Sequence, residues 1–334
     1  MSLAPSRRRV STFIGALLLG LTLSFFFFSS FSSSSPISST GHFTRTSSPA
    51  GSDEVVRISK SNKSAAGIPH KVWQIFFPRR DTVVSEDMRK SVGSWATVNP
   101  DSTYTRFDQQ GAETFVRQHF ANRPDIVRVY TELQVPILQL DFLRYMILAA
   151  EGGVYADTDV FTEKPIKHWV PRNMRKKVRA IVGIEYDKLD DAEIDGAFYY
   201  AIQFCQWTIA SSKGHPMLQL AVDTTAKAID NLAKRQQCEV GDLEPTDWDV
   251  LNTTGPIMWT NVVFRSLSAA SGRNVSTDEL TKLEEPKLFG DILVLPIDGF
   301  STGISHSGSG RHGEQALIRH AFKGTWRGMD IDAD

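Results

Sequence analysis

Two aspartates separated by one residue, Asp157 and Asp159, are the clearest candidates for chemistry in this sequence. They interrupt an apolar stretch, residues 154–161, which is expected to be a strand. Because residues two apart on a strand point to the same side, the two carboxylates would repel each other unless a cation lay between them. Oxygen ligands suit Mg²⁺ or Mn²⁺, which takes its remaining ligands from water and from a substrate phosphate. The pair therefore predicts a divalent ion and a phosphorylated substrate.

The spacing of the two aspartates does not by itself fix their role. A structural alternative stays open, in which Asp157 caps a loop and Asp159 pairs with an arginine. Phosphatases with an aspartyl nucleophile also use Asp-x-Asp, but they need Thr or Val two residues after the second aspartate, where this chain has Phe161. The sequence therefore argues against that class. Further pairs lie in polar surroundings, where we expect solvated carboxylates: Asp247/Asp249, Asp330/Asp332 and Asp332/Asp334.

The elements that must position these aspartates alternate between strand and helix. Strands are expected at residues 68–77, 102–108, 154–161, 179–186, 203–211 and 291–296. Helices are expected at residues 82–97, 135–150, 215–235 and 257–267. This alternation predicts an α/β fold with a mainly parallel sheet, whose site lies at the carboxyl ends of the strands.

The helix expected at residues 135–150 is apolar on nearly every face and is therefore predicted to be mostly buried. Two charged residues on it, Asp141 and Arg144, are conspicuous for that reason. Gly152 and Gly153 are expected to end the helix directly before the strand that carries the aspartate pair.

Composition excludes several classes of protein. A net charge of −1 gives no general attraction to nucleic acid, so we expect no nucleic-acid partner. Hydrophobic residues make up 41% of the chain, which fits a globular protein and excludes a wholly disordered one. The two cysteines, Cys205 and Cys238, exclude a cysteine-based zinc cluster. Cys205 is expected to be a buried thiol, and a disulfide between the two is left open.

The N-terminal residues predict a membrane anchor. Residues 12–28 are an apolar run that, as a helix, spans about 26 Å, close to the thinner membranes of the early secretory pathway. Arg7, Arg8 and Arg9 would hold residues 1–11 in the cytoplasm, which makes a type II protein with its remainder in the lumen. A cleaved signal peptide is the alternative, although the phenylalanines that end the run approach a cleavage site poorly.

The remaining chain divides by composition. Residues 29–66 are rich in Ser and Thr and are expected to form a flexible stem. One globular domain is expected at residues 67–328, followed by an acidic tail at residues 329–334. Sequons at Asn62, Asn252 and Asn274 agree with a lumenal location, and Asn252 is the least suited because it lies in an apolar stretch.

Several motifs linked by their spacing resemble a known family. The stretch from Asp141 to Arg144, followed by Gly-Gly-Val-Tyr-Ala-Asp-Thr-Asp at residues 152–159, resembles the sugar-binding signature of glycosyltransferase family 32. Other stretches are similar to the fungal initiation-specific α-1,6-mannosyltransferases: residues 68–74, 202–217, 254–260 and 320–326. Together they cover most of residues 68–326.

The resemblance implies a GT-A fold, a Rossmann-like domain carried on an N-terminal membrane anchor. It implies Mn²⁺ or Mg²⁺ as cofactor, GDP-mannose as donor, and transfer of mannose in α-1,6 linkage to a mannose of an N-glycan core on a glycoprotein. It also implies residence in the Golgi membrane, with the catalytic domain lumenal and other mannosyltransferase subunits as partners.

The resemblance also assigns roles to residues. Asp157 would contact the nucleotide ribose and the metal, Asp159 would be the main metal ligand, and His320 a further one. The other expected donor-binding residues are Trp73 and Gln74 at the base, Asp141 and Arg144 at the sugar and phosphate, Trp326 at the leaving diphosphate, and Tyr155 and Thr325 without an assigned part of the donor. The family usually has Gly-Ser-Trp where this chain has Gly-Thr-Trp at residues 324–326, which keeps the hydroxyl.

An α linkage formed from an α-linked donor retains configuration, which calls for a nucleophilic carboxylate or a same-face mechanism. The sequence does not choose between them. Glu185 and Asp187, at the end of an expected strand, are candidates on the acceptor side. Two other functions stay open: transfer of mannose to inositol phosphoceramide, and an inactive lumenal subunit of a mannosyltransferase complex.

Overall fold

The computed structural model describes residues 54–57, 67–78, 84–191 and 193–322. The expected cytoplasmic tail, the anchor at residues 12–28, nearly all of the stem and the acidic tail lie outside these residues, as do Asn62, Thr325 and Trp326. Among the described residues, no helix combines the length and the apolar character that crossing a membrane requires.

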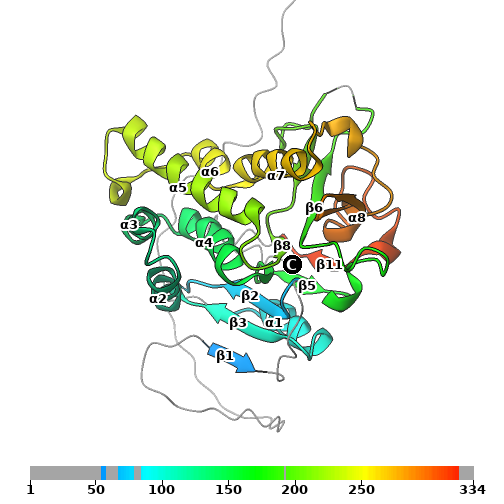
Figure 1. Ribbon diagram of the computed structural model, residues 1–334, viewed down its shortest axis with the longest axis horizontal. Helices are drawn as coiled ribbons and strands as arrows, with labels where there is room; N and C mark the ends of the chain where they lie inside the picture. Colours follow the sequence, from blue (N-terminus) through cyan, green and yellow to red (C-terminus); the bar gives the residue numbers. More distant parts are fainter. Residues whose placement is uncertain (1–53, 58–66, 79–83, 192, 323–334) are drawn as a thin grey trace, which may run out of the picture. The chain divides into compact units, whose positions relative to one another are not determined.

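A nine-stranded sheet forms the centre of the described fold, in the order β1-β3-β2-β4-β8-β6-β10-β9, with β7 paired to β6 (Figure 1). Its strands are β1 (Glu54–Arg57), β2 (Lys71–Ile75), β3 (Thr103–Phe107), β4 (Gly153–Ala156), β6 (Ala180–Asp187), β7 (Ile202–Phe204), β8 (Thr208–Ser211), β9 (Lys287–Phe289) and β10 (Ile292–Leu295). Strands β3, β2, β4, β6 and β10 run in one direction, whereas β1, β7, β8 and β9 are antiparallel to their neighbours. The predicted α/β fold with a mostly parallel sheet is confirmed.

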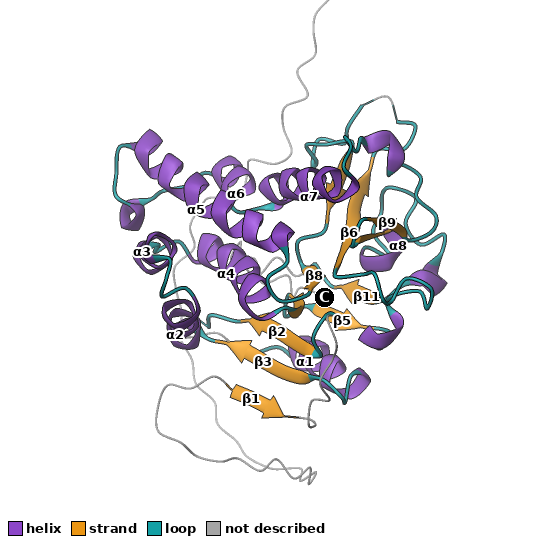
Figure 2. Cartoon of the chain, viewed as in Figure 1, coloured by secondary structure: helices purple, strands orange, loops and turns teal. Residues whose placement is uncertain are grey.

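Hydrophobic clusters cover both faces of this sheet. Adjacent strand residues alternate between them, as the pleat requires: Trp73 and Tyr155 join the cluster of α4, whereas Val72 and Val154 join the one that contains Trp95. The helices, shown in Figure 2, are α1 (Glu86–Val98), α2 (Gln109–His119), α3 (Pro124–Glu132), α4 (Pro136–Glu151), α5 (Pro216–Gln236), α6 (Asp247–Thr253), α7 (Pro256–Ser271) and α8 (Ile297–Phe300). Helices α2 and α3, which the sequence pattern does not predict, connect β3 to α4.

Helix α4 is buried along most of its length, as expected, and both Asp141 and Arg144 are among its buried residues. Its end depends on two glycines. Gly152 has φ +63° and Gly153 has φ +106°, and a Cβ at Gly153 would lie 2.6 Å from the carbonyl oxygen of Lys71. Only glycine therefore lets the chain turn from α4 directly into β4 beside β2.

The single strand expected at residues 154–161 is wrong. The chain forms β4, then a turn in which the Val160 N–H donates to the Asp157 carbonyl at 3.1 Å, and then β5 (Val160–Thr162). Strand β5 leaves the main sheet and pairs antiparallel with β11 (Ile318–His320). The strand expected at residues 203–211 is likewise two strands, β7 and β8. In both places one apolar run is divided into two strands: β5 pairs with β11, and β8 pairs with β4 as well as with β6, the partner of β7.

Asp249 is also not solvated, contrary to the expectation for its Asp-x-Asp pair. It is 8% exposed and forms a capping box with Thr246 at the start of α6. Its carboxylate also pairs with Arg235. The residue is therefore structural, which agrees with excluding this pair from the site.

Replacing Asp249 with alanine is expected to lower the free energy of unfolding by about 1–2 kcal/mol, since it removes a helix cap. Asp247→Ala is the matched control, because Asp247 is exposed in the same helical turn and makes no capping bond. Its effect should be less than half as large. Urea denaturation of both variants measures the difference, and equal effects would contradict the structural role of Asp249.

Candidate active site

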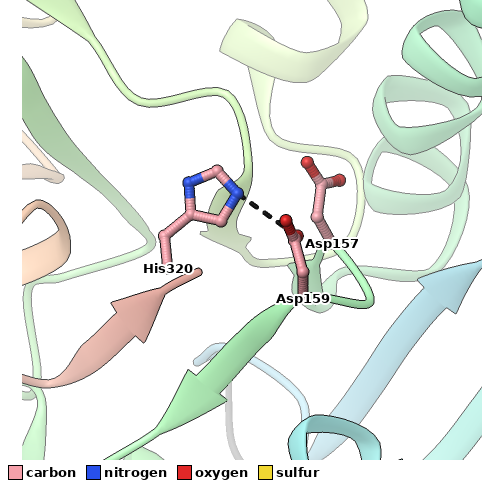
Figure 3. Close-up of side chains that lie close together, drawn as sticks. All are labelled: Asp157, Asp159 and His320. Atoms are coloured by element: carbon pink, nitrogen blue, oxygen red, sulfur yellow. Dashed lines mark ion pairs between the residues drawn. The ribbon is translucent and has the colours of Figure 1, made fainter. Parts of the chain in front are cut away.

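Three side chains from two distant parts of the chain converge at the carboxyl end of β4. Asp157, Asp159 and His320 each offer a ligand atom, and these atoms lie within 4.8 Å of one another. Figure 3 shows both carboxylates and the imidazole facing a common point, with His320 Nε2 at 3.2 Å from Asp159 Oδ1. The predicted metal-ligand set is thus assembled, although the two aspartates share a turn and not a strand face.

Hydrogen bonds to the backbone fix the turn that carries the aspartates. The Asp157 N–H donates to the Trp207 carbonyl at 2.9 Å, and the Gln74 side-chain amide donates to the Asp157 carbonyl at 2.9 Å. On the other side, the Ala321 N–H donates to the Asp159 carbonyl at 3.0 Å, next to the pairing of β11 with β5. This pairing brings His320 to a motif about 160 residues earlier.

Arg144 places a buried positive charge behind the aspartates. Its Nη2 lies 2.8 Å from Asp141 Oδ1 and 3.6 Å from Asp157 Oδ1. Burial alone would lower the pKa of Arg144, but Asp157, Tyr155 and Asp141 raise it above its ordinary value. Arg144 is therefore a permanent cation at the base of the site.

Burial raises the pKa of two carboxylates of the site, Asp141 and Asp157. Burial raises the pKa of Asp141 to about 6, although Arg144 and the Thr254 hydroxyl favour its charged form. Burial also raises the pKa of Asp157, and the neighbouring charge of Asp159 raises it further, whereas Arg144 opposes the shift. A cation bound between Asp157 and Asp159 would relieve this cost.

Two polar residues without a predicted role, Gln206 and Thr254, complete the support of Asp141 and Arg144. The Thr254 hydroxyl donates to Asp141 Oδ2 at 2.8 Å, and Arg144 Nη1 donates to the Gln206 carbonyl at 3.0 Å. The Gln206 amide donates to the Thr254 carbonyl at 2.8 Å, which links them. Both lie in stretches that carry the family resemblance, and this is the signal in the sequence that could have pointed to them.

Trp73, Gln74 and Tyr155 lie next to the motif but are deeply buried. The Trp73 N–H donates to the Gly152 carbonyl at 2.7 Å, and the Gln74 oxygen accepts from the Tyr104 hydroxyl at 2.6 Å. The Tyr155 hydroxyl donates to Asp157 Oδ1 at 2.5 Å. These contacts hold the end of α4 and the aspartate turn in place, and a direct contact of the three residues with a donor stays a prediction.

The two acceptor-side candidates lie in different environments. Glu185 is the extra residue of a β-bulge between β6 and β7, accepts from the Gln203 amide at 3.1 Å, and is close enough to His320 to interact electrostatically. Burial raises the pKa of Glu185 to about 7. The Asp187 carboxylate instead accepts from the Thr281 hydroxyl at 2.8 Å and the Lys282 N–H at 2.6 Å. Glu185 is the candidate for chemistry, and Asp187 organises a loop.

His320 lies among aromatic rings, and the two cysteines are free thiols. The His320 ring packs against both Trp207 and Phe322, with ring centroids 4.6 Å and 4.0 Å away, and these two rings also contact each other, with centroids 5.3 Å apart. Cys205 is a buried thiol, as expected, and neither Cys205 nor Cys238 is in a disulfide.

Comparison with known proteins assigns this arrangement to a family. Residues 85–176 match the glycosyltransferase sugar-binding region containing a DXD motif. The initiation-specific alpha-1,6-mannosyltransferase of Candida albicans is 31% identical over 287 residues, which cover 78% of this chain and 72% of the relative. The chain belongs to this glycosyltransferase family.

One further relative and one solved structure are also similar to this chain. The initiation-specific alpha-1,6-mannosyltransferase of Schizosaccharomyces pombe is 36% identical over 272 residues, or 78% of this chain. The chain spans 64% of the length of that relative. Among solved structures, a PaToxG glycosyltransferase has a TM-score of 0.40 at 16% identity, over 61% of this chain and 72% of the other.

Proposed function

We propose that this chain is a metal-dependent, retaining mannosyltransferase of GT-A fold, which moves mannose from GDP-mannose to a mannose of an N-linked glycan core in α-1,6 linkage. The observation that carries the proposal is the convergence of Asp157, Asp159 and His320 beside the buried Arg144. The named activity of the relatives supports mannose as the transferred sugar.

The residues present fit a divalent ion. Two carboxylates and one imidazole offer ligand atoms within 4.8 Å, a mixed oxygen and nitrogen set that favours Mn²⁺ over Mg²⁺, which keeps to oxygen ligands. The ion would be held by Asp157, Asp159 and His320. When bound, it supplies positive charge that stabilises the departing diphosphate.

The other residues prepare the site for an anionic donor. Arg144 offers a planar fork of donors suited to phosphate, and its Nε is buried without a partner among the described residues. Asp141, with both oxygens occupied by Arg144 and Thr254, would act on the donor by orienting Arg144. Glu185 supplies a carboxylate at the site for a retaining reaction, as nucleophile or as base.

We also propose that the protein is located in the Golgi membrane. The apolar run at residues 12–28 and the arginines before it support a single-span type II anchor, which would place the catalytic domain in the Golgi lumen. Other mannosyltransferase subunits would meet the enzyme there.

The test is a panel of nucleotide sugars offered to the purified full-length protein in detergent, with and without a core N-glycan. We expect release of GDP from GDP-mannose that needs Mn²⁺ and is stopped by EDTA, and transfer to the glycan. Cleavage of UDP-sugars but not GDP-mannose would overturn the mannosyl assignment. Absence of release with every nucleotide sugar would instead indicate an inactive subunit.

A further inference from the structure

An exposed pair of aromatic rings lies outside the metal-ligand set. Tyr199 is 51% exposed and Trp248 is 46% exposed, although aromatic side chains of this size are usually buried. Their ring centroids are only 4.5 Å apart, and they come from segments about 50 residues apart in the sequence. Paired rings that stay in solvent are typical of a surface that binds a ligand.

Hydrogen bonds and a ring contact hold the rings. The Lys188 N–H donates to the Ala201 carbonyl at 2.8 Å and closes the base of the loop between β6 and β7. Tyr200 packs edge-on against Tyr199, and its hydroxyl accepts from the Asn261 amide of α7 at 2.9 Å. We call Tyr199, Tyr200 and Trp248 the aromatic patch. Because these contacts already restrain the rings, binding a ligand would cost little side-chain entropy.

The aromatic patch is connected to the donor site through α6. Trp248 lies in the first turn of this seven-residue helix, and Thr254, which directly follows the helix, donates to Asp141. At 1.5 Å per residue, the backbone of Trp248 lies about 9 Å along the helix from that of Thr254. The other part of the patch, Tyr199, lies on the loop that follows β6, the strand that carries Glu185. A ligand that extends from the site by a few sugar rings could therefore reach the patch.

The loop that carries Tyr199 has four carboxylates against one lysine, Lys188, and this acidity indicates the class of ligand. Asp247 precedes Trp248, and four exposed carboxylates lie on the loop: Asp190, Asp191, Glu193 and Asp195. Among them, Asp190 is paired with Lys282. Aromatic faces pack against the C–H faces of sugar rings, and carboxylates accept hydrogen bonds from hydroxyl groups. An anionic headgroup or membrane surface would be repelled.

We propose that the aromatic patch is a subsite for a neutral oligosaccharide, the part of the acceptor glycan that lies away from the sugar being extended. The inference rests on the proposed transfer to a glycan and adds how the acceptor is recognised. It predicts that large glycans are better acceptors than small mannosides because only large ones reach Trp248.

The test compares acceptors of two sizes on the full-length protein. In Trp248→Ala, the KM for a core N-glycan should rise about tenfold, as for loss of an aromatic anchor. The kcat, the KM for GDP-mannose and the KM for methyl α-mannoside should stay within about twofold, since the patch is remote from the reacting groups. Trp248→Phe should recover most of the affinity, and Ile194→Ala, an exposed apolar side chain on the same loop, should behave as wild type.

The outcomes separate this inference from the proposed function. Unchanged KM values for both acceptors in Trp248→Ala, in an enzyme that transfers mannose, would overturn the subsite and leave the function standing. If the wild type transfers no sugar, saturation-transfer NMR of the N-glycan without donor tests the patch directly, and equal signals from wild type and Trp248→Ala would overturn it. Binding of anionic vesicles that depends on Trp248, or a glycan on Asn252 that covers the patch, would also contradict it.

Discussion

Replacing Asp159 with alanine is expected to reduce mannosyl transfer by a factor of about 10³ or more, because a metal ion contributes several kcal/mol to transition-state stabilisation and each 1.36 kcal/mol is tenfold in rate. Asp159 lies next to both His320 and Asp157, so its loss leaves only two of the three metal ligands. The loss should appear in kcat at saturating GDP-mannose.

The same variant should remain folded. In the metal-free protein, Asp159→Ala relieves the repulsion that raises the pKa of Asp157 but also removes the contact with His320, so its melting temperature should stay within a few degrees of that of the wild type. The rise in melting temperature that Mn²⁺ causes in the wild type should disappear, since ligands stabilise only proteins that bind them. Thr158→Ala, in the same turn, is the matched control and should keep its activity within a few-fold. Full activity of Asp159→Ala would contradict the assignment of the site.

The second large effect is expected at Glu185. Glu185→Gln should lower kcat by about 10²–10⁴, the usual contribution of a positioned acid, base or nucleophile, with little change in the KM for the donor. The bulge in β6 places this carboxylate near His320, and the Gln203 amide holds it. Steady-state kinetics with saturating donor and glycan measure the change. A variant with wild-type kcat would remove Glu185 from the reaction.

The pH dependence of activity distinguishes a chemical role of Glu185 from a purely structural one. The pKa of Glu185 is raised to about 7, so its ionised form is lost as the pH falls through that value. Activity that needs the carboxylate should therefore fall on the acid side in the wild type, at a lower pH once a nearby cation is bound. In Glu185→Gln this limb should be absent, and only the fall caused by protonation of Asp141 and Asp157 should remain. Asp187→Asn is the contrasting variant. It should lower stability by about 1–3 kcal/mol through lost buried hydrogen bonds and leave the shape of the profile unchanged.

Much of the fold follows from local sequence signals. Helix α4 is predicted because Pro136 suits its first turn, and Gly152 and Gly153 can take the positive φ angles that follow it. The break between β4 and β5 could not be predicted in the same way. The residues on both sides of the turn are apolar, and only the pairing of β5 with β11, a strand more than 150 residues later, separates them.

The site is predictable to a similar degree. Asp141 and Arg144 stand out as charges on an apolar helix, and they do form a buried ion pair. The resemblance selects His320 as a metal ligand, and the structure brings it to Asp159. Gln206 and Thr254 lie in stretches that carry the resemblance, but their specific role cannot be predicted from the sequence, because it depends on burial and on contacts across the fold.

The most direct test of the central claim is a titration of Mn²⁺ into the full-length protein with GDP present, followed by electron paramagnetic resonance of the free ion. The wild type is predicted to bind one ion per chain, and Asp159→Ala and His320→Ala are each predicted to lose that binding while Thr158→Ala keeps it. Binding of Mn²⁺ that is equal in all four proteins, or absent from the wild type, would contradict a metal site made by Asp157, Asp159 and His320.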